Sequence, residues 1–352
     1  MTTRPELGAR RFVVAAVACV VAVVAGACGG DDAADQLHPT SSTTTTIKPV
    51  KSEPEAALMD ALCGGAPKIT DVGTIEAAEI TEASGLVASW ANTGDGADGV
   101  WWTHNDSGDG ARIFAINGTG KLLATVELTG AEGRDWEDIA VGPPALPGGS
   151  PQLYVGDIGN NKAMLSDPTA RKSVRIYRLD EPVVPTTPPA DGSPAPVIKA
   201  PVTTFSLRYP EQPYDAEALI VDPVVGDINL ITKDWGRSGE SLVFRMPKAA
   251  LIADGTSIDM LPAGSVPLEP GTLVTAGDVT RDGTLVALRS YGGVSVYRRP
   301  EGKQLAEAFA TTPCEGPAPT EVQGEALGFA PDGGSYLTTS EGDHQVIHRT
   351  SP

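Results

Sequence analysis

Seven carboxylates recur at corresponding points of a repeated pattern of short apolar segments. Glutamate stands at the start of the first segment in three repeats, and an acid closes the second segment in four: Glu137, Glu217 and Glu325, then Asp106, Asp157, Asp234 and Glu341. Like charges that crowd together repel, and a bound cation relieves the repulsion. Oxygen ligands suit a hard ion, and the sequence has no His/Cys cluster with the spacing of zinc ligands. The pattern therefore predicts a cation site, with Ca²⁺ as the expected ion.

The same acids have a second interpretation as turn residues. Aspartate and glycine are common in tight turns, where the carboxylate accepts hydrogen bonds from nearby backbone amides. Asp106-Ser-Gly and Asp157-Ile-Gly fit that role. Glutamate is poorly suited to strands, so the glutamate series is the stronger evidence for a shared ion. At the level of sequence both interpretations stay open.

Three residues beside the acids could act on an anion. Lys233 and Arg289 lie in two of the second segments, and His104 lies in another. If the cation polarises a phosphate and activates a water, Lys233 and Arg289 would hold the phosphate oxygens. The alternative is that they are counter-charges to the acids. His104 is a further catalytic candidate, although it belongs to no Ser/His/Asp spacing, and the GxSxG motif of a hydrolase nucleophile is absent.

The elements that position these residues are short strands separated by glycine, proline and aspartate. Thirty prolines and forty glycines argue against long helices. The strands fall into four positions, a to d, of a repeated unit. Strands a are expected at 84–89, 138–142, 218–222, 278–282 and 326–330, and strands b at 100–106, 152–157, 228–234, 285–291 and 335–341. Strands c are expected at 112–118, 174–179, 242–247, 294–299 and 345–349, and strands d at 122–128, 202–209, 257–268 and 305–312.

The last unit lacks a strand d, and a spare strand at 70–80 precedes the first strand a. This arrangement predicts an all-β fold, a single β-propeller of five four-stranded blades that an N-terminal strand closes by completing the last blade. Six blades is the alternative, because the third strand d is weak. A proline-rich insertion at 181–201 is expected to be a surface loop of the second blade. Starts of strands a and ends of strands b then meet at one mouth of the channel.

The order of the short motifs resembles the phytase-like β-propeller family, also described as the esterase-like activity of phytase. The motifs are EASGL with HNDSG (82–86, 104–108), DWEDIA with GDIGNN (135–140, 156–161), DAEAL with TKD (215–219, 232–234), ALRSY (287–291), and GEALGFAPDG with TSEG (324–333, 339–342). The resemblance implies a secreted propeller and calcium-assisted hydrolysis of phosphomonoesters. Blade four departs from the acid pattern, because Gly277 and Tyr291 stand where acids are expected. In blade one, Ser84 stands at the position that a glutamate occupies in three other blades.

The N-terminus resembles a bacterial lipoprotein signal. Three arginines precede an apolar run that ends in Ala25-Gly26-Ala27-Cys28. We therefore expect a signal peptide at 1–27, a lipid on Cys28, a disordered Thr/Ser/Pro-rich tether at 28–54, and the propeller domain at 55–352. The protein would then be exported and anchored at the outer face of the cell membrane. An ordinary cleavage site with an incidental cysteine is the alternative. Cys63 and Cys314 remain after processing, and in an oxidising compartment they are expected to form a disulfide.

The formal net charge of −19 leaves no basic footprint for DNA or RNA, so no nucleic-acid partner is predicted. Two functions remain open. One is a calcium-dependent phosphoric-ester hydrolase. The other is a non-catalytic propeller that binds a small anionic or phosphorylated ligand, or an envelope protein. A glycan-processing enzyme with paired carboxylates is a third possibility, which depends on a separation between two acids that a sequence does not contain.

The lipid anchor is tested by replacing Cys28 with alanine. Because acylation needs the thiol, the Cys28→Ala variant should leave the membrane fraction or remain unprocessed, as measured by cell fractionation and mobility on a denaturing gel. A variant that fractionates and migrates like the parent would show that Cys28 carries no lipid.

Overall fold

The computed structural model describes residues 53–93, 99–165, 167–317 and 319–352. The chain divides into two units, Met1–Pro49 and Val50–Pro352. The predicted signal peptide, Cys28 and the tether as far as residue 52 lie outside the described residues. No helix in the described part of the chain is both long and apolar enough to cross a membrane.

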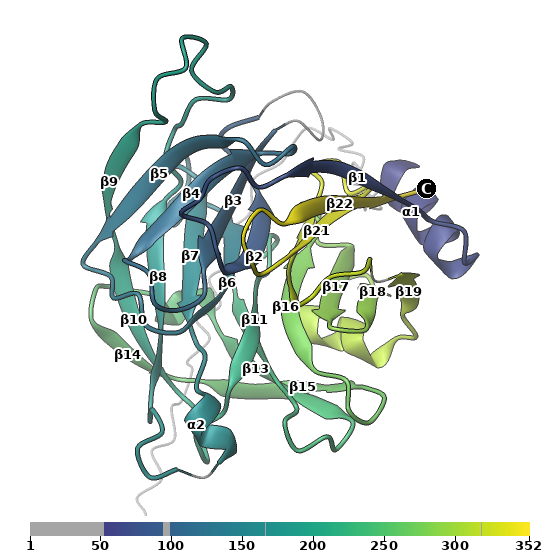
Figure 1. The fold of residues 1–352 in the computed structure, drawn as a ribbon. Helices are drawn as coiled ribbons and strands as arrows, with labels where there is room; N and C mark the ends of the chain where they lie inside the picture. Colours follow the sequence, from purple (N-terminus) through teal and green to yellow (C-terminus); the bar gives the residue numbers. More distant parts are fainter. Residues whose placement is uncertain (1–52, 94–98, 166, 318) are drawn as a thin grey trace, which may run out of the picture. The chain divides into compact units, whose positions relative to one another are not determined.

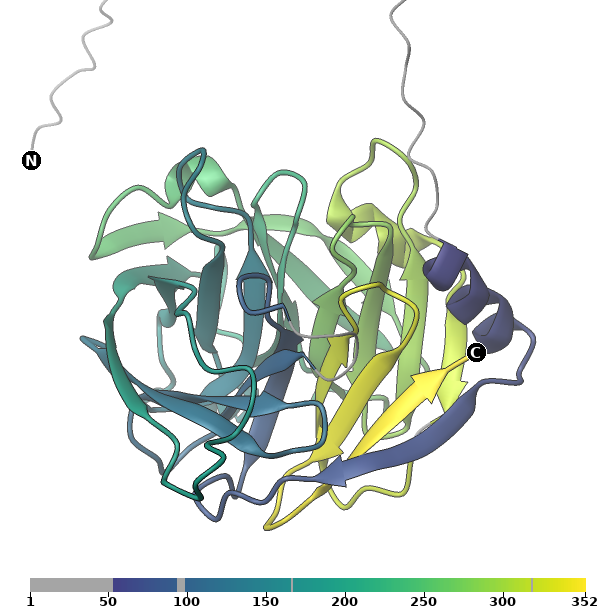
Figure 2. The ribbon, with the colours of Figure 1, turned by 90° about the horizontal axis from the view of Figure 1, so that it is seen from above.

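The second unit is a five-bladed β-propeller, as the sequence predicts (Figures 1 and 2). Its innermost strands contact one another in a closed ring, and they are β2 (Ala83–Ala88), β6 (Trp136–Gly142), β11 (Ala216–Val221), β16 (Val274–Val279) and β20 (Gly324–Phe329). The next strands outward are β3 (Val100–Asn105), β7 (Gln152–Asp157), β12 (Ile228–Thr232), β17 (Leu285–Ser290) and β21 (Tyr336–Ser340). The third strands are β4 (Arg112–Asn117), β8 (Val174–Asp180), β13 (Glu240–Met246), β18 (Gly293–Arg298) and β22 (Val346–Ser351). The fourth are β5 (Leu122–Thr129), β10 (Thr203–Arg208), β15 (Leu261–Pro267), β19 (Cys314–Pro317) and β1 (Lys68–Thr74).

The core lies between adjacent blades. Four of the five innermost strands are buried at every residue, because each packs against a neighbouring blade on both sides. Large side chains fill the spaces between blades, as Trp102, Trp136 and Tyr177 do between blades one and two. This burial on two faces explains why strands a and b read as continuous apolar runs without alternation.

The ring closes as predicted, because β1 pairs with β22 and supplies the missing fourth strand of the last blade (Figures 1 and 2). The helix α1 (Glu53–Cys63) precedes β1 and packs against β19. Its apolar face buries Leu58, Met59 and Leu62 among residues of blades four and five. A disulfide joins Cys63 at the end of α1 to Cys314 at the start of β19, with the two Cα atoms 4.8 Å apart. The predicted cysteine pair is therefore present at the seam.

A buried carboxylate holds the innermost strands together at the channel. Asp138 on β6 accepts hydrogen bonds from the backbone N–H groups of Leu219 on β11, at 2.9 Å, and of Gly277 on β16, at 3.2 Å. One side chain thus links blades two, three and four. Its neighbour along the chain, Glu137, belongs to the mouth described below, so this link also fixes the backbone of the site.

The sequence analysis placed two strands of blade four incorrectly. Residues 305–312 form the 3-10 helix η3 (Leu305–Ala310) instead of strand d, and β19 is the fourth strand. Leu305, Ala306, Ala308 and Phe309 are buried from this segment, a helical spacing, and a capping box between Gln304 and Glu307 begins it. The innermost strand is Val274–Val279, so it begins four residues before the expected 278–282 and ends before Arg281 and Asp282, which lie in the turn that follows.

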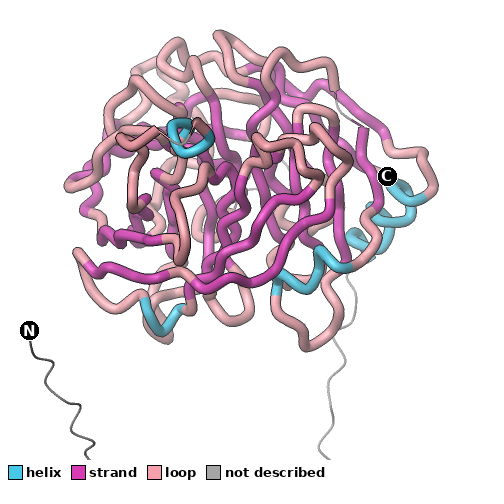
Figure 3. The backbone as a smooth tube through the Cα atoms, turned by 90° about the horizontal axis from the view of Figure 1, so that it is seen from below, coloured by secondary structure: helices cyan, strands magenta, loops and turns pink. Residues whose placement is uncertain are grey.

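The outer edges of blades one and two are extended by strands that the sequence analysis missed. β9 (Val197–Pro201), within the insertion expected as a loop, pairs parallel with β5 of blade one. β14 (Thr256–Asp259) pairs parallel with β10 of blade two. The weak third strand d is therefore two strands, β14 and β15, that belong to different blades. Helices are few and short, including α2 (Asn161–Met164) and η2 (Lys248–Ala250) (Figure 3).

The disulfide should contribute measurably to stability, since it closes a segment with a sequence separation of 251 residues. Replacing Cys63 with serine should lower the free energy of unfolding by about 2–5 kcal/mol in denaturant titrations under oxidising conditions. Cys314→Ser should give the same loss, and the double variant no more, because each removes the same bond. Three variants that unfold like the parent, or two free thiols found by mass spectrometry of exported protein, would contradict this.

Candidate functional site

Each innermost strand carries a β-bulge near its first residues, at the same mouth of the channel. In each case the pairing with the second strand skips one residue of the innermost strand: Gly85, Glu137, Glu217, Thr275 and Glu325. A bulge leaves an extra residue outside the regular ladder and changes the direction of its side chain. Three of the five are the glutamates of the sequence pattern, which explains why a residue that disfavours strands recurs there.

The bulge register corrects the expected equivalences in the other two blades. Thr275, and not Gly277, is the counterpart of the glutamates in blade four, and Gly85 is the skipped residue in blade one. Thr275 donates its hydroxyl to the carbonyl of Gly324 at 2.9 Å, while Ser84 donates to the carbonyl of Glu137 at 2.6 Å. The hydroxyls in these blades therefore bind the backbone of a neighbouring blade.

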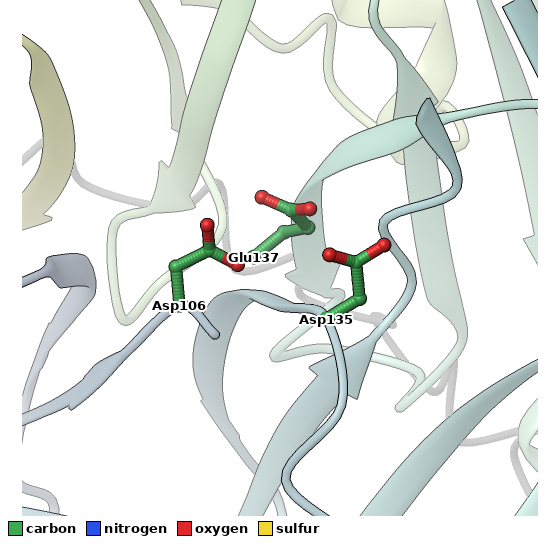
Figure 4. A group of neighbouring side chains, drawn as sticks. All are labelled: Asp106, Asp135 and Glu137. Atoms are coloured by element: carbon green, nitrogen blue, oxygen red, sulfur yellow. The ribbon is translucent and has the colours of Figure 1, made fainter. Parts of the chain in front are cut away.

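The acids of the mouth form two groups that share Glu137. One contains Asp106, Asp135 and Glu137 (Figure 4), and the other contains Glu137, Asp215 and Glu217. In each group, one oxygen from every carboxylate lies within 4.8 Å of the others. Figure 4 shows the three carboxylates of the first group gathered around one space. Such a set of oxygens has the dimensions of a coordination shell.

Glu137 is the central residue of the site. Its side chain is only 4 % exposed, and no hydrogen bond from the described residues reaches its carboxylate. Asp106 contributes a second buried oxygen, Oδ1, without a partner in the described part of the chain. A buried carboxylate without a donor or counter-charge is unfavourable unless it is protonated or binds a cation.

The pKa values of these acids are raised, as expected for buried carboxylates that lie close together. Burial, followed by the charges of Glu217 and Asp106, raises the pKa of Glu137 well above its usual value. Burial also raises the pKa of Glu217, against the opposing effect of Lys233. Burial and the charge of Asp135 raise the pKa of Asp106 to about 7, and burial with Glu325 raises that of Glu341 to about 9. Without a cation, the mouth therefore favours partly protonated carboxylates.

Lys233 brings a positive charge to the mouth from blade three. Its Nζ lies 3.0 Å from Oε1 of Glu217 and donates to the Tyr291 hydroxyl at 3.3 Å. That hydroxyl in turn donates to Oε1 of Glu325 at 2.7 Å. Burial alone would lower the pKa of Lys233, but the combined attraction of Glu217, Tyr291 and Glu325 outweighs it and the pKa is raised. Tyr291, which stands where an acid was expected, thus links blades three and five.

Four predicted ligands lie outside both groups: Asp157, Asp234, Glu325 and Glu341. Glu325 accepts hydrogen bonds from the Tyr291 hydroxyl and, at 3.2 Å, from the Gln323 amide. Oε1 of Glu341 is buried without a partner among the described residues. Asp157 forms a buried ion pair with Arg171 and accepts a hydrogen bond from the Tyr177 hydroxyl at 3.3 Å. Asp234 accepts from the backbone N–H of Gly239 at 2.8 Å and the hydroxyl of Ser238 at 3.1 Å. The turn interpretation therefore describes Asp234, and Asp157 is part of a local ion pair.

Arg289 and His104 are enclosed between blades. Arg289 is 3 % exposed, forms an ion pair with Glu321 and donates to the carbonyl of Ala326 at 2.8 Å, and burial lowers its pKa to about 10. His104 is fully buried, with Nδ1 2.9 Å from the carbonyl oxygen of Asn105. Burial lowers the pKa of His104 to about 4, so the imidazole is neutral at physiological pH.

Sequence reasoning missed Asp135 and Asp215 as members of the groups, although both lie in quoted motifs. Each stands two residues before a bulged glutamate, in DWE and DAE, and this repeated D-x-E spacing is a signal that could have found them. Arg171 was also missed. It contacts Asp157 and Gly159 and lies 3.9 Å from Asp135, but nothing in its local sequence marks it.

No family model matches this sequence, and a search of curated proteins gave no match either. The fold and the site together define a five-bladed β-propeller with a cluster of buried carboxylates at one mouth.

The raised pKa values predict how stability depends on pH in the absence of a cation. Glu137, Glu217, Asp106 and Glu341 bind protons more tightly in the folded chain than in the unfolded chain, where carboxyl pKa values are about 4. The folded state therefore holds more protons above that pH, and the free energy of unfolding falls as pH rises. In EDTA, Tm should decrease from about pH 5 to pH 9, with the contribution of Asp106 lost by about pH 7 and that of Glu341 by about pH 9.

Carboxyl groups with lowered pKa values, such as Asp234, lose their stabilising contribution only below this window. His104, whose pKa is lowered to about 4, opposes the decline below about pH 6.5 by at most one proton, against the four carboxyl groups that cause it. Calcium should flatten the decline, because it replaces the protons. A melting temperature in EDTA that is constant or rises between these pH values would contradict the electrostatic description of the mouth.

Proposed function

We propose that the mouth of this propeller binds a hard divalent cation, with Ca²⁺ as the first candidate. The observation that carries the proposal is the carboxylate of Glu137, which is 4 % exposed, lacks a hydrogen-bond donor among the described residues and belongs to both acidic groups. An unpaired buried charge is costly, and a cation offsets that cost. The acids are crowded in the folded state only, so the ion would stabilise that state.

The donor set fits this ion. Asp106 and Asp135 would hold the cation together with Glu137, and Asp215 and Glu217 form a second set of oxygens with the same glutamate. All five groups are carboxylates, which favour calcium or magnesium over zinc or copper. Calcium accepts six to eight oxygens in flexible geometry, whereas magnesium demands a nearly ideal octahedron. A set built from blades one, two and three suits the more permissive ion.

The proposed ligand of the loaded site is a phosphomonoester, and its hydrolysis is the activity that the resemblance to phytase-like propellers implies. A bound calcium would supply the positive charge that polarises a phosphate oxygen. The ammonium of Lys233, which lies 3.0 Å from Glu217 at the mouth, would bind a second oxygen of the phosphate. Arg289 would act only through the backbone of Ala326, because its guanidinium is held by Glu321.

A specific observation favours the second candidate, a propeller that binds an anionic ligand or an envelope protein without catalysis. The ammonium of Lys233 is already paired with Glu217, and His104 is buried and neutral. The hydroxyls of Ser84 and Thr275 donate to backbone carbonyls, and that of Ser238 donates to Asp234, which lies outside both acidic groups. In a propeller that binds its ligand without catalysis, Lys233 would affect only the affinity for that ligand.

The proposal places the protein at the outer face of the cell membrane, with the lipid on Cys28 as its anchor. The small residues before Cys28 and the polar tether after it support this location. The disulfide between Cys63 and Cys314 supports it as well, since such bonds persist in oxidising compartments.

The cation site is tested by calcium titration. Calcium should raise Tm, because a ligand that binds only the folded state stabilises it by about 2.7 kcal/mol at a hundredfold excess over Kd. Glu137→Gln keeps the shape of the side chain, removes its charge from both groups, and should lower calcium affinity at least tenfold. The control is Glu127→Gln, which removes an equal charge from an exposed residue paired with Lys199 at 3.2 Å and should bind calcium like the parent.

If calcium leaves the melting temperature and the calorimetric signal of the parent unchanged, the cation proposal fails. If calcium binds, hydrolysis of p-nitrophenyl phosphate decides between the two candidates. An enzyme should show calcium-dependent turnover that Lys233→Ala reduces through kcat. Calcium and phosphate binding without turnover, with Lys233→Ala weakening phosphate affinity alone, would establish the binding module.

A further inference from the structure

A cavity of about 340 Å³ opens beside the cation cluster on blade three. Three segments line it: the residues that precede β11, the loop between β12 and β13, and the end of α2. Its volume is at the lower end of the range of small-molecule pockets, about 300–1,000 Å³. A molecule the size of one sugar ring, but not a large cofactor, would fill it.

The cavity is continuous with the site described above. Asp215 lines it and also belongs to the acidic group with Glu137 and Glu217. Lys233 lines it as well, and its Nζ lies 3.0 Å from Glu217. A ligand with a phosphate at the cation cluster could therefore extend its organic part into this cavity.

Two aromatic residues form a rigid part of the wall. The indole N–H of Trp235 donates to Oδ2 of Asp215 at 2.6 Å, and Nζ of Lys233 lies 4.9 Å from the centre of the indole ring. Tyr214 packs against the rings of Tyr209 and Phe244, each with its centre 5.3 Å away. Fixed aromatic side chains lose little freedom on binding, and their faces pack against flat apolar surfaces.

The rest of the lining is largely polar, and hydrogen bonds hold its loop. Asp234 accepts hydrogen bonds from Ser238 and Gly239 and so holds the loop between β12 and β13. Within this loop Arg237 has a φ of 52°, a left-handed conformation that non-glycine residues seldom adopt and that recurs in ligand-binding loops. Gln212 and Glu240 add an amide and a carboxylate that can bind hydroxyl groups.

We propose that this cavity is a subsite for the organic part of the ligand and that it selects a phosphorylated sugar of about one ring. The inference rests on the proposed function. A sugar ring combines an apolar C–H face, which suits Trp235 and Tyr214, with hydroxyls, which suit Gln212 and Glu240. An alkyl chain would leave that polar wall unpaired, and a chain without a ring would leave the aromatic faces uncovered.

The first experiment compares three compounds by calorimetry in the presence of calcium: glucose 6-phosphate, glycerol 3-phosphate and inorganic phosphate. The two esters have the same charge and differ in the ring, which should make glucose 6-phosphate bind about tenfold more tightly. If the esters are hydrolysed, their kcat/KM values should differ in the same ratio. Equal values would overturn the proposal, and p-nitrophenyl phosphate that binds as tightly as the sugar ester would overturn the assignment to a sugar.

The second experiment uses variants of the wall. Trp235→Leu should reduce the preference for glucose 6-phosphate over glycerol 3-phosphate to about one, with inorganic phosphate binding retained. Met164→Trp, which fills the cavity from α2, should exclude the sugar ester in the same way. Leu165→Trp is the matched control, because Leu165 is the next residue along the chain, is 70 % exposed and does not line the cavity.

The failures of the two proposals are distinguishable. If calcium and inorganic phosphate bind but the ring gives no advantage, the subsite is wrong and the cation site stands. If calcium does not bind the parent, the proposed function fails. Calcium affinity measured for each variant separates a change in the cavity from an indirect effect on Asp215. A preference for the sugar ester that both Trp235→Leu and Met164→Trp leave intact would place the ring elsewhere.

Discussion

Repulsion among buried carboxylates is the constraint on which the mouth of this propeller depends. Glu137 and Glu217 are almost fully buried, and Asp106 and Asp215 lie close to them. Two cations in the described part of the chain face these acids, because Lys233 is paired with Glu217 and Arg171, which is paired with Asp157, lies 3.9 Å from Asp135. They offset only part of the negative charge of the five carboxylates in the two groups. The carboxylates must therefore remain partly protonated or share a cation, in agreement with pKa values that burial, and then the neighbouring charges, raise for Glu137 and Asp106.

The fold brings these charges together through two features. The first is a bulge at one place in every innermost strand, which turns a glutamate into the mouth in three blades. The second is closure of the ring, because the site needs blades one, two and three at fixed distances. β1 completes the last blade, and the disulfide fastens α1 to β19 beside that seam. Asp138, next to Glu137, ties three blades through backbone hydrogen bonds and keeps the bulge in place.

The repeat of short strands was enough to predict five blades and their closure, because each strand is bounded by turn residues and the last blade visibly lacks a strand. Where long-range pairing decides, the prediction failed. Residues 305–312 have strand-like composition but bury their apolar side chains with helical spacing, and β9 and β14 pair with blades distant in sequence. The glutamate series correctly indicated one mouth. Asp157 and Asp234 were misjudged because a turn aspartate and a mouth aspartate look alike until their hydrogen bonds are seen.

The central claim is that Glu137 is a cation ligand, and a crystal structure of the exported domain grown with calcium tests it most directly. We predict density for an ion coordinated by Glu137 together with Asp106 and Asp135, or with Asp215 and Glu217, at oxygen distances of about 2.3–2.6 Å. Replacement of calcium by manganese should give an anomalous signal at the same position. A mouth without an ion under these conditions, in which the carboxylate of Glu137 is hydrogen-bonded to a neighbouring acid, would contradict the account.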